Sequence, residues 1–342
     1  MHDKTITKII KKDNIREWVT ELIKNYDVIA PVKVDKDTFF RRISTADEIN
    51  FDFISGAFNT KVPPTEFFLA RSEIIFEFNG ENVDAGNTEN NAKKNRIIFG
   101  IRPCDVYALN LLDKVYNENF EDVNYREKRE KTSMISFNCT SPGENCFCES
   151  VISEDKVNAD VILTDIGGKF YVEAKQGKLL MPYELFEECT GDDKKIKEKN
   201  RKEFKNKFSL SMNLKNLEKL DSVFNDKYWS KVARTCISCG VCTFLCPACY
   251  CFNVFDESKV TEQKGKRVKC RDSCQFPDFT LLAGGENPRK TKGDRLKQRI
   301  YHKFRYFPGK YGELQCTGCG RCISLCPVNI NIIHIIEDLD KI

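Results

Sequence analysis

The chain carries one cysteine pattern twice, and this repeat constrains its fold more than any other feature. Each copy reads C-x2-C-x2-C-x3-C-P, first over residues 236–247 and again over residues 316–327. In the bacterial ferredoxin run with this spacing, three closely spaced thiolates hold one iron–sulfur cube and the fourth thiolate reaches the other cube. The repeat therefore predicts two 4Fe-4S clusters with crossed ligands.

The crossed arrangement assigns four cysteines to each cube. Cluster 1 is expected to use Cys236, Cys239, Cys242 and Cys326, and cluster 2 is expected to use Cys316, Cys319, Cys322 and Cys246. A protein that holds two such cubes side by side transfers electrons, so electron transfer is the function that this repeat predicts.

Two other interpretations of these cysteines are weaker. Cysteine pairs two residues apart also build zinc ribbons and thioredoxin-like sites, but here a third and a fourth cysteine follow at fixed offsets, twice, without a neighbouring His. Cys242, Cys246 and Cys249 also form the C-x3-C-x2-C triplet of radical enzymes that cleave S-adenosylmethionine. Two members of this triplet already belong to the ferredoxin run, which favours the two cubes.

The composition is that of an ordinary globular chain. Its 342 residues, 41% of them hydrophobic, are enough for two or three domains. A net charge of +4 is too mild to indicate nucleic-acid binding. We expect a cytoplasmic protein without membrane attachment, because the N-terminus lacks an apolar signal region and no stretch approaches the ~20 apolar residues that span a bilayer. The 17 cysteines then indicate metal-bound thiolates in an anaerobic setting rather than disulfides.

The fold predicted from these patterns is α+β. A helix is expected over residues 15–25 after Asp13 and Asn14 as caps, then strands at 27–34 and 38–43 and a short acidic helix from Thr45. Apolar strands at 96–101 and 133–138, with a helix after Pro103 between them, indicate a βαβ unit, and a hairpin follows that turns at residues 167–168.

Three regions follow from this pattern. Residues 1–190 are expected to form an α/β domain, residues 191–225 a charged linker, and residues 226–342 a dicluster ferredoxin-like domain. The segment between the two cysteine runs is far longer than a simple ferredoxin needs, so the last domain is expected to carry a long insertion.

The N-terminal half contains four cysteines that suit a third cluster, namely Cys104, Cys139, Cys146 and Cys148. Cys104 and Cys139 each follow a predicted parallel strand, so both should lie at the carboxyl edge of the sheet, where ligands bind. The start of the following helix should favour a thiolate at Cys104. Reduced, half-buried thiols are the alternative, Asp105 is a weaker candidate for an oxygen ligand, and Cys189 is expected to be a lone thiol.

The insertion adds four more cysteines, Cys249, Cys251, Cys270 and Cys274. They fit a further cluster, a redox disulfide or no site at all, and Cys249 is close enough to Cys246 to do no more than shape the loop around the second cube. Residues 287–310 form the most basic stretch. It suits offsetting the negative charge of the cubes, docking an acidic partner, or simply a solvated helix face.

Several kinds of site are missing from the sequence. No G-x-G-x-x-G follows a strand and no P-loop is present, so no flavin or nicotinamide site is expected in this chain. Only His2, His302 and His334 are available for acid–base chemistry or metal binding. We therefore predict no catalytic residue, and a chain that conducts electrons rather than one that catalyses a reaction alone.

The motifs GIRPCDVYALNLLDKVY, NCTSPGENCFC, CISCGVCTFLCPACYCFNVFDE, DSCQFPDFTLLAGG and CTGCGRCISLCP together resemble one family of iron–sulfur subunits. The family includes the beta subunit of sulfhydrogenases and the corresponding iron–sulfur subunit of anaerobic sulfite reductase, and PPTEFF favours the hydrogenase side. The resemblance covers the chain in order except for residues 189–226. It includes the four N-terminal cysteines and Cys249, Cys251 and Cys274, but Arg271, Glu286 and Pro288 depart from the family pattern.

The resemblance implies a place in a hetero-oligomeric complex. In that family the protein passes electrons between a flavoprotein partner that carries FAD and uses NAD(P)H, and a terminal catalytic partner of the NiFe hydrogenase or sirohaem sulfite reductase type. Two other classes stay open from sequence. One is a reductase with its own substrate site, and the other is a redox-sensing scaffold.

Overall fold

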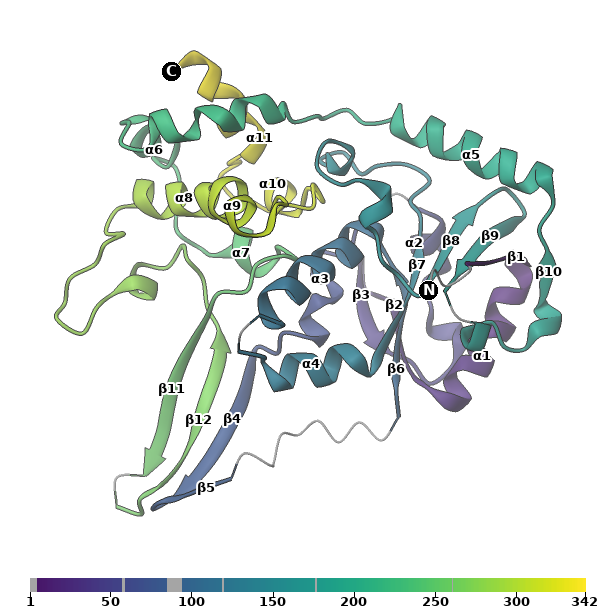
Figure 1. The fold of residues 1–342 in the computed structure, drawn as a ribbon, viewed down its shortest axis with the longest axis horizontal. Helices are drawn as coiled ribbons and strands as arrows, with labels where there is room; N and C mark the ends of the chain where they lie inside the picture. Colours follow the sequence, from purple (N-terminus) through teal and green to yellow (C-terminus); the bar gives the residue numbers. More distant parts are fainter. Residues whose placement is uncertain (1–4, 57–58, 85–93, 119, 176, 260) are drawn as a thin grey trace.

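A computed structural model describes residues 5–56, 59–84, 94–118, 120–175, 177–259 and 261–342 (Figure 1). An eight-stranded sheet in the order β10-β1-β9-β8-β7-β6-β2-β3 forms the centre of the N-terminal half. Its strands are β1 (Ile6–Lys11), β2 (Asp27–Val34), β3 (Asp37–Arg42), β6 (Arg96–Ile101), β7 (Thr132–Phe137), β8 (Val161–Asp165), β9 (Lys169–Ala174) and β10 (Phe186–Glu188). Neighbouring strands from β2 through β6 and β7 to β8 run parallel, and the outer pairs run antiparallel.

Helices cover both faces of this sheet. They are α1 (Ile15–Asn25), α2 (Phe51–Ser55), α3 (Pro103–Tyr116), α4 (Val123–Glu130) and α5 (Gly191–Lys205). On one face α1 packs through Trp18, whose indole donates to the Leu179 carbonyl at 2.8 Å. On the other face α3 packs through Val106, Leu109 and Leu112. The predicted helix at 15–25, the strands and the βαβ unit are confirmed, although the Asn14 side chain makes no capping hydrogen bond.

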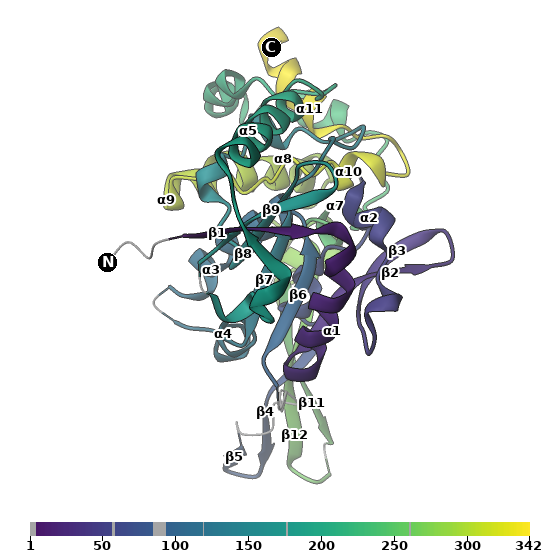
Figure 2. The same cartoon turned by 90° about the vertical axis from the view of Figure 1, so that its right-hand side faces the viewer.

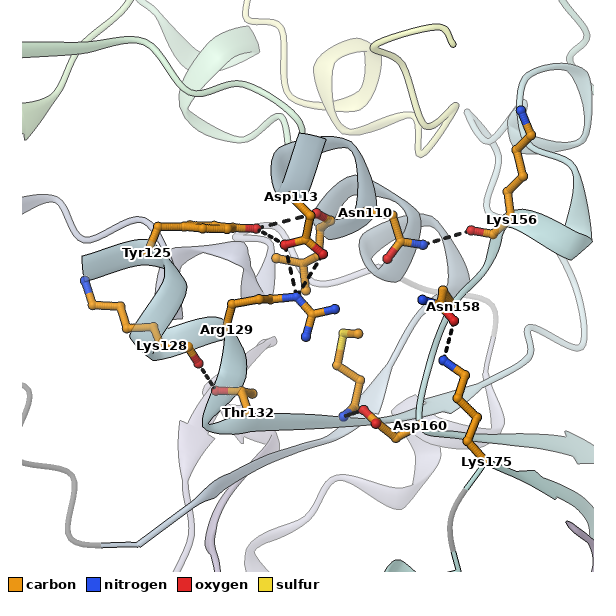
Figure 3. A network of polar contacts seen from close by, with 12 residues as sticks. Asn110, Asp113, Tyr125, Lys128, Arg129, Thr132, Lys156, Asn158, Asp160 and Lys175 are labelled. Atoms are coloured by element: carbon orange, nitrogen blue, oxygen red, sulfur yellow. Dashed lines mark hydrogen bonds and ion pairs between the residues drawn. The ribbon is translucent and has the colours of Figure 1, made fainter. Parts of the chain in front are cut away.

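Polar contacts fix α3 relative to its neighbours (Figure 3). The Asp113 carboxylate accepts a hydrogen bond from the Tyr125 hydroxyl at 2.7 Å and from Arg129 Nε at 3.1 Å, both on α4. Asn110 donates to the Lys156 carbonyl at 2.8 Å, just before β8. These contacts hold α3, whose first turn carries Cys104, against α4 and the segment that precedes β8.

A second sheet projects from the body as an arm, at the lower left of Figure 1 and at the bottom of Figure 2. It has the order β11-β12-β4-β5 and is antiparallel throughout. Its strands are β4 (Ser72–Asn79), β5 (Asn82–Asp84), β11 (Phe252–Lys259) and β12 (Lys264–Arg271). The arm therefore joins the insertion between the two cysteine runs to strands from the N-terminal half.

Short helices gather above the arm, at the upper left of Figure 1 and in the upper part of Figure 2. They are α6 (Tyr228–Val232), α7 (Val241–Phe244), α8 (Lys292–Tyr301), a π-helix (His302–Tyr306), α9 (Phe307–Tyr311), α10 (Arg321–Ser324) and α11 (Ile332–Glu337). They share a core of their own around Trp229, Ile300 and Ile336. The α+β fold class with this C-terminal region is confirmed.

The stretch expected as a charged linker begins with a well-defined helix. Thr190 and Asp193 cap α5 reciprocally, and Phe204 is buried at its other end. Lys197 pairs with Glu173 of β9 at 2.7 Å, so α5 lies against the sheet. The division into three regions at residues 190 and 226 stays a prediction. Within the described residues, no helix is long and apolar enough to cross a membrane.

Candidate metal centre

The two cysteine runs adopt the same backbone conformation. Their third residues, Ser238 and Gly318, have φ of 56° and 58°, and their fifth residues, Gly240 and Gly320, have φ of 74° and 75°. Each run then enters a one-turn helix, α7 or α10, and these two helices lie side by side. Left-handed residues turn the chain back on itself, so successive cysteines of one run face a common point.

The cysteines expected around cluster 1 line one pocket, which we call the first site. It contains Cys236, Cys239 and Cys242 from the first run and Cys326 from the second. Cys322 also borders it, so the two runs meet there as the crossed pattern predicts. Arg299 lines the same pocket, and its Nε is buried without a hydrogen-bond partner among the described residues.

The cysteines expected around cluster 2, Cys316, Cys319, Cys322 and Cys246, form the second site. Burial raises the pKa of Cys316 to about 12, and the nearby Cys322 and Cys246 sulfurs add to this increase. Burial also raises the pKa of Cys319, again with a contribution from Cys246. Lys303 connects Cys246 to the second run, because its Nζ lies 3.2 Å from Cys246 Sγ and 3.0 Å from the carbonyl oxygen of Gln315, the residue before Cys316.

The four N-terminal cysteines line one cavity, which we call the third site. Cys104, Cys139, Cys146 and Cys148 border a cavity of about 310 Å³. Cys319 of the second site borders it too. Asn59 connects the two, because Cys104 Sγ lies 3.6 Å from its Oδ1 while its amide donates to the Cys319 carbonyl at 3.2 Å.

The loops of the second and third sites approach each other backbone to backbone. The Phe147 amide donates to the Gly318 carbonyl at 2.8 Å. A Cβ on Gly318 would lie 2.5 Å from the Cys148 backbone, and one on Gly320 would lie 2.4 Å from the Asn145 carbonyl oxygen. The second site therefore adjoins the third site at this junction, and it adjoins the first site through Cys322.

A buried ion pair crosses the same junction. Arg321 Nη1 and Nη2 donate to the two carboxylate oxygens of Asp105 at 2.6 and 2.8 Å, and Arg321 Nε donates to the Thr60 carbonyl. Both charged side chains are almost wholly buried. Both carboxylate oxygens are engaged by Arg321, which disfavours Asp105 as an oxygen ligand. Its role in metal binding stays a prediction.

Cys104 lies in the first turn of α3, as expected, but its environment does not favour the thiolate in the metal-free chain. Burial raises the pKa of Cys104 well above its ordinary value, and the adjacent Asp105 carboxylate raises it further. The helix N-terminus stabilises a thiolate, but this stabilisation is smaller than the free-energy cost of removing the thiolate from water.

The insertion cysteines divide into two groups. Cys249 interacts with Cys246, and Cys251 interacts with Cys274. The hydrogen bond with Cys251 lowers the pKa of Cys274 to about 6, while the pKa of Cys251 is raised. Cys270 instead lies within β12, opposite Asn253 and Ser72 of the flanking strands. Cys189 stands apart and lies 3.2 Å from the Thr7 hydroxyl. Metal binding by the insertion cysteines stays a prediction.

The basic stretch contains a buried stripe that the sequence interpretation did not single out. Arg295, Arg299 and Lys303 lie four residues apart and are all buried, whereas Lys290 and Lys292 are exposed. Arg295 donates to Ser238 Oγ at 3.2 Å, and Arg299 donates to the Cys242 carbonyl at 3.3 Å. The spacing of four was visible in the sequence, and it places these cations on one helix face. That face points at the cysteines, so the offset of cluster charge is favoured over a solvated face.

The donor sets fit 4Fe-4S cubes. Each of the three sites offers four thiols, and the first two also present the buried cations Arg299 and Lys303 to ligands that would carry negative charge. The unpartnered Nε of Arg299 is a donor for which a cluster or its thiolates would provide an acceptor. Among the described residues, no group of three or more His, Cys, Asp or Glu side chains is arranged to hold a single metal ion.

Comparison with known proteins decides the family. A family model described as a 4Fe-4S dicluster domain matches residues 235–330, which contain both cysteine runs. The curated sulfhydrogenase 2 subunit beta of Pyrococcus furiosus is 31% identical over 322 residues, covering 91% of this chain and 92% of that protein. The chain belongs to the sulfhydrogenase beta-subunit family. No solved structure gives a significant match.

As a member of the sulfhydrogenase beta-subunit family, the chain is a 4Fe-4S electron-transfer protein related to hydrogenase subunits. This confirms the resemblance drawn from the sequence motifs and the electron-transfer function predicted from the repeated pattern. The number of clusters, their individual ligands and the partner proteins stay predictions.

Proposed function

We propose that this sulfhydrogenase-beta-like chain is the electron-relay subunit of an oxidoreductase complex and holds three 4Fe-4S clusters in a row. The observation that carries the proposal is Cys319, which belongs to the second ferredoxin run and also borders the cavity of the four N-terminal cysteines. Electrons entering at one end of the row would pass through the second site to reach the other end.

The residues of the chain supply the sites and control their surroundings. Each cube, when bound, accepts and releases one electron through thiolate-ligated iron. Cys236, Cys239, Cys242 and Cys326 would hold the first cube, Cys316, Cys319, Cys322 and Cys246 the second, and Cys104, Cys139, Cys146 and Cys148 the third. Buried cations near the first two sites and the Asp105–Arg321 pair near the third set the local charge, which with hydrogen bonding tunes the potentials.

The proposed partners follow from the family. The relative is named as a beta subunit, which supports a hetero-oligomeric complex for this chain as well. One partner would be a flavoprotein that carries FAD and uses NAD(P)H, and the other a terminal catalytic subunit of the NiFe hydrogenase or sirohaem sulfite reductase type. This chain would carry electrons between the two partners, and we propose no catalytic residue among its described residues.

Iron content tests this proposal. We expect the full chain, purified without oxygen, to contain ~12 irons with matching acid-labile sulfide, and a Cys146→Ser variant to contain ~8. Cys189→Ser is the matched control, because Cys189 lies away from all three sites, and it should keep the full iron content. About 8 irons in the unaltered chain would overturn the third cluster. Zinc without sulfide would overturn the electron-relay function altogether.

A further inference from the structure

The helix that carries the buried cations changes its winding where it meets the second site. It runs as an α-helix to Tyr301, continues as a π-helix over His302–Tyr306 and returns to α-helix at Phe307. Such π-segments are rare and occur frequently at functional sites. Here the π-helical segment contains Lys303.

Lys303 is almost completely buried and makes two defined contacts. Only 2% of its surface is exposed. Its Nζ lies 3.2 Å from Cys246 Sγ and 3.0 Å from the Gln315 carbonyl oxygen. Both contacts are to atoms that accept a hydrogen bond from an ammonium group, so this buried geometry suits a charged lysine.

No carboxylate among the described residues forms an ion pair with Lys303. A buried ammonium without a counter-charge is costly, so a negative group must offset it. Cys246 is a predicted ligand of the second cube, and a cube held by four thiolates is anionic. The contact between Nζ and Cys246 Sγ thus gives the cation its counter-charge and gives the second site a positive neighbour.

The third site has a different electrostatic environment. Its buried cation, Arg321, is neutralised by both carboxylate oxygens of Asp105. The second site therefore faces the positive charge of Lys303, which no carboxylate among the described residues neutralises, with Arg299 nearby. The third site faces the Asp105–Arg321 pair, and the two cations that line its cavity, Lys197 and Arg201, are paired with Glu173 and Glu154. A positive charge stabilises the more negative, reduced form of a cluster and so raises its reduction potential.

We propose that Lys303 is a positioning residue that raises the reduction potential of the second cluster above that of the third, so that an electron arriving at the third site is drawn to the middle of the row. The proposal rests on the proposed function, because it requires clusters at both sites. It deepens that function by giving the relay a direction of favourable electron flow.

Redox titration of the full chain, followed by electron paramagnetic resonance, tests the proposal. We expect Lys303→Met to lower the potential of the second cluster so that, at the midpoint potential of the unaltered chain, its reduced-to-oxidised ratio falls about tenfold, which corresponds to about 59 mV for a one-electron couple. Lys303→Arg keeps the charge and should restore most of the ratio. The matched control is Arg305→Met, which removes one exposed charge from the same π-helix and should leave the ratio unchanged.

Each outcome decides the matter. Equal shifts in Lys303→Met and Arg305→Met, or no shift with full iron content, would overturn the role of Lys303. If Lys303→Met loses iron, Lys303→Gln replaces it, since the amide keeps a donor for Cys246 without the charge. Loss of the second cube from Lys303→Met and Lys303→Gln but not from Lys303→Arg would show that this cube needs the positive charge at position 303, which supports the proposal. Loss of the cube from all three variants would show that Lys303 acts only through packing, which overturns it. Absence of the clusters from the unaltered chain would instead overturn the proposed function.

Discussion

At the scale of single residues, equivalent positions in the two cysteine runs differ for a steric reason. Position three of each run is left-handed, and the first run tolerates Ser238 there while the second has Gly318. The difference follows from the neighbours, because only at Gly318 does another backbone, that of Cys148, lie where a Cβ would be. The sequence alone shows the two residues but not the close approach that requires glycine at one of them.

We therefore expect Gly318→Ala to weaken the junction of the second and third sites. Gly312→Ala is the matched control, because Gly312 also has a positive φ, of 73°, but has open space around it. The control should lose about 1 kcal/mol from left-handed strain, whereas Gly318→Ala should lose a further 1–3 kcal/mol, roughly, from overpacking. Urea unfolding and iron content measure this. Equal losses in the two variants would show that the steric contact is unimportant.

At the scale of elements, apolar runs were predictable and polar strands were not. Strands β6 and β7 were visible because buried parallel strands are continuous apolar stretches. Strand β1 was not predicted, because its lysines interrupt the apolar pattern of a buried strand. In the structure Lys8 and Lys11 form ion pairs with Glu188 and Glu187 of the adjacent β10. The arm was missed as well, since β4 and β12 are far apart in the sequence and only tertiary structure pairs them.

The same limit applies to the candidate sites. The eight ferredoxin cysteines and the four N-terminal ones could be grouped from their spacing and from the strands that precede them. In the structure the first-site cysteines line one pocket and the four N-terminal cysteines line another. The partner of Asp105 could not be predicted, because Arg321 lies in another region of the chain and no local pattern connects the two residues.

This ion pair links α3 to α10, and breaking it should be costly. We expect Asp105→Asn to lower the free energy of unfolding by about 3–5 kcal/mol, because it leaves the buried Arg321 without its counter-charge. Asp221→Asn removes one partner of the exposed Arg305–Asp221 pair, which has the same two-bond geometry, and should have little effect on the free energy of unfolding, because solvent screens the charge that remains. Urea unfolding of both variants checks this, and similar losses would contradict the assigned importance of burial.

At the scale of the whole molecule, the N-terminal and C-terminal halves of the chain are joined by contacts to which both halves contribute. Strand β12 pairs with β4, and the second cysteine run packs on the loop that carries Cys148. A fragment of residues 226–342 would expose an unpaired strand edge and leave Arg321 without Asp105. The ferredoxin-like region is thus expected to depend on the N-terminal half.

Separate expression of the two parts tests this dependence. We expect residues 226–342 alone to aggregate or to retain well below the ~8 irons of two cubes. Co-expression with residues 1–225 should restore both solubility and iron. A fragment that alone keeps about 8 irons and unfolds at the same urea concentration as the full chain would show that the regions are independent.

The backbone contact between Gly318 and Cys148 also couples the positions of the second and third sites. Because the Phe147 amide is held by the Gly318 carbonyl, the loop of one site is part of the wall of the next. Because this contact is made by the polypeptide itself, any displacement of one loop would also displace the wall of the neighbouring site.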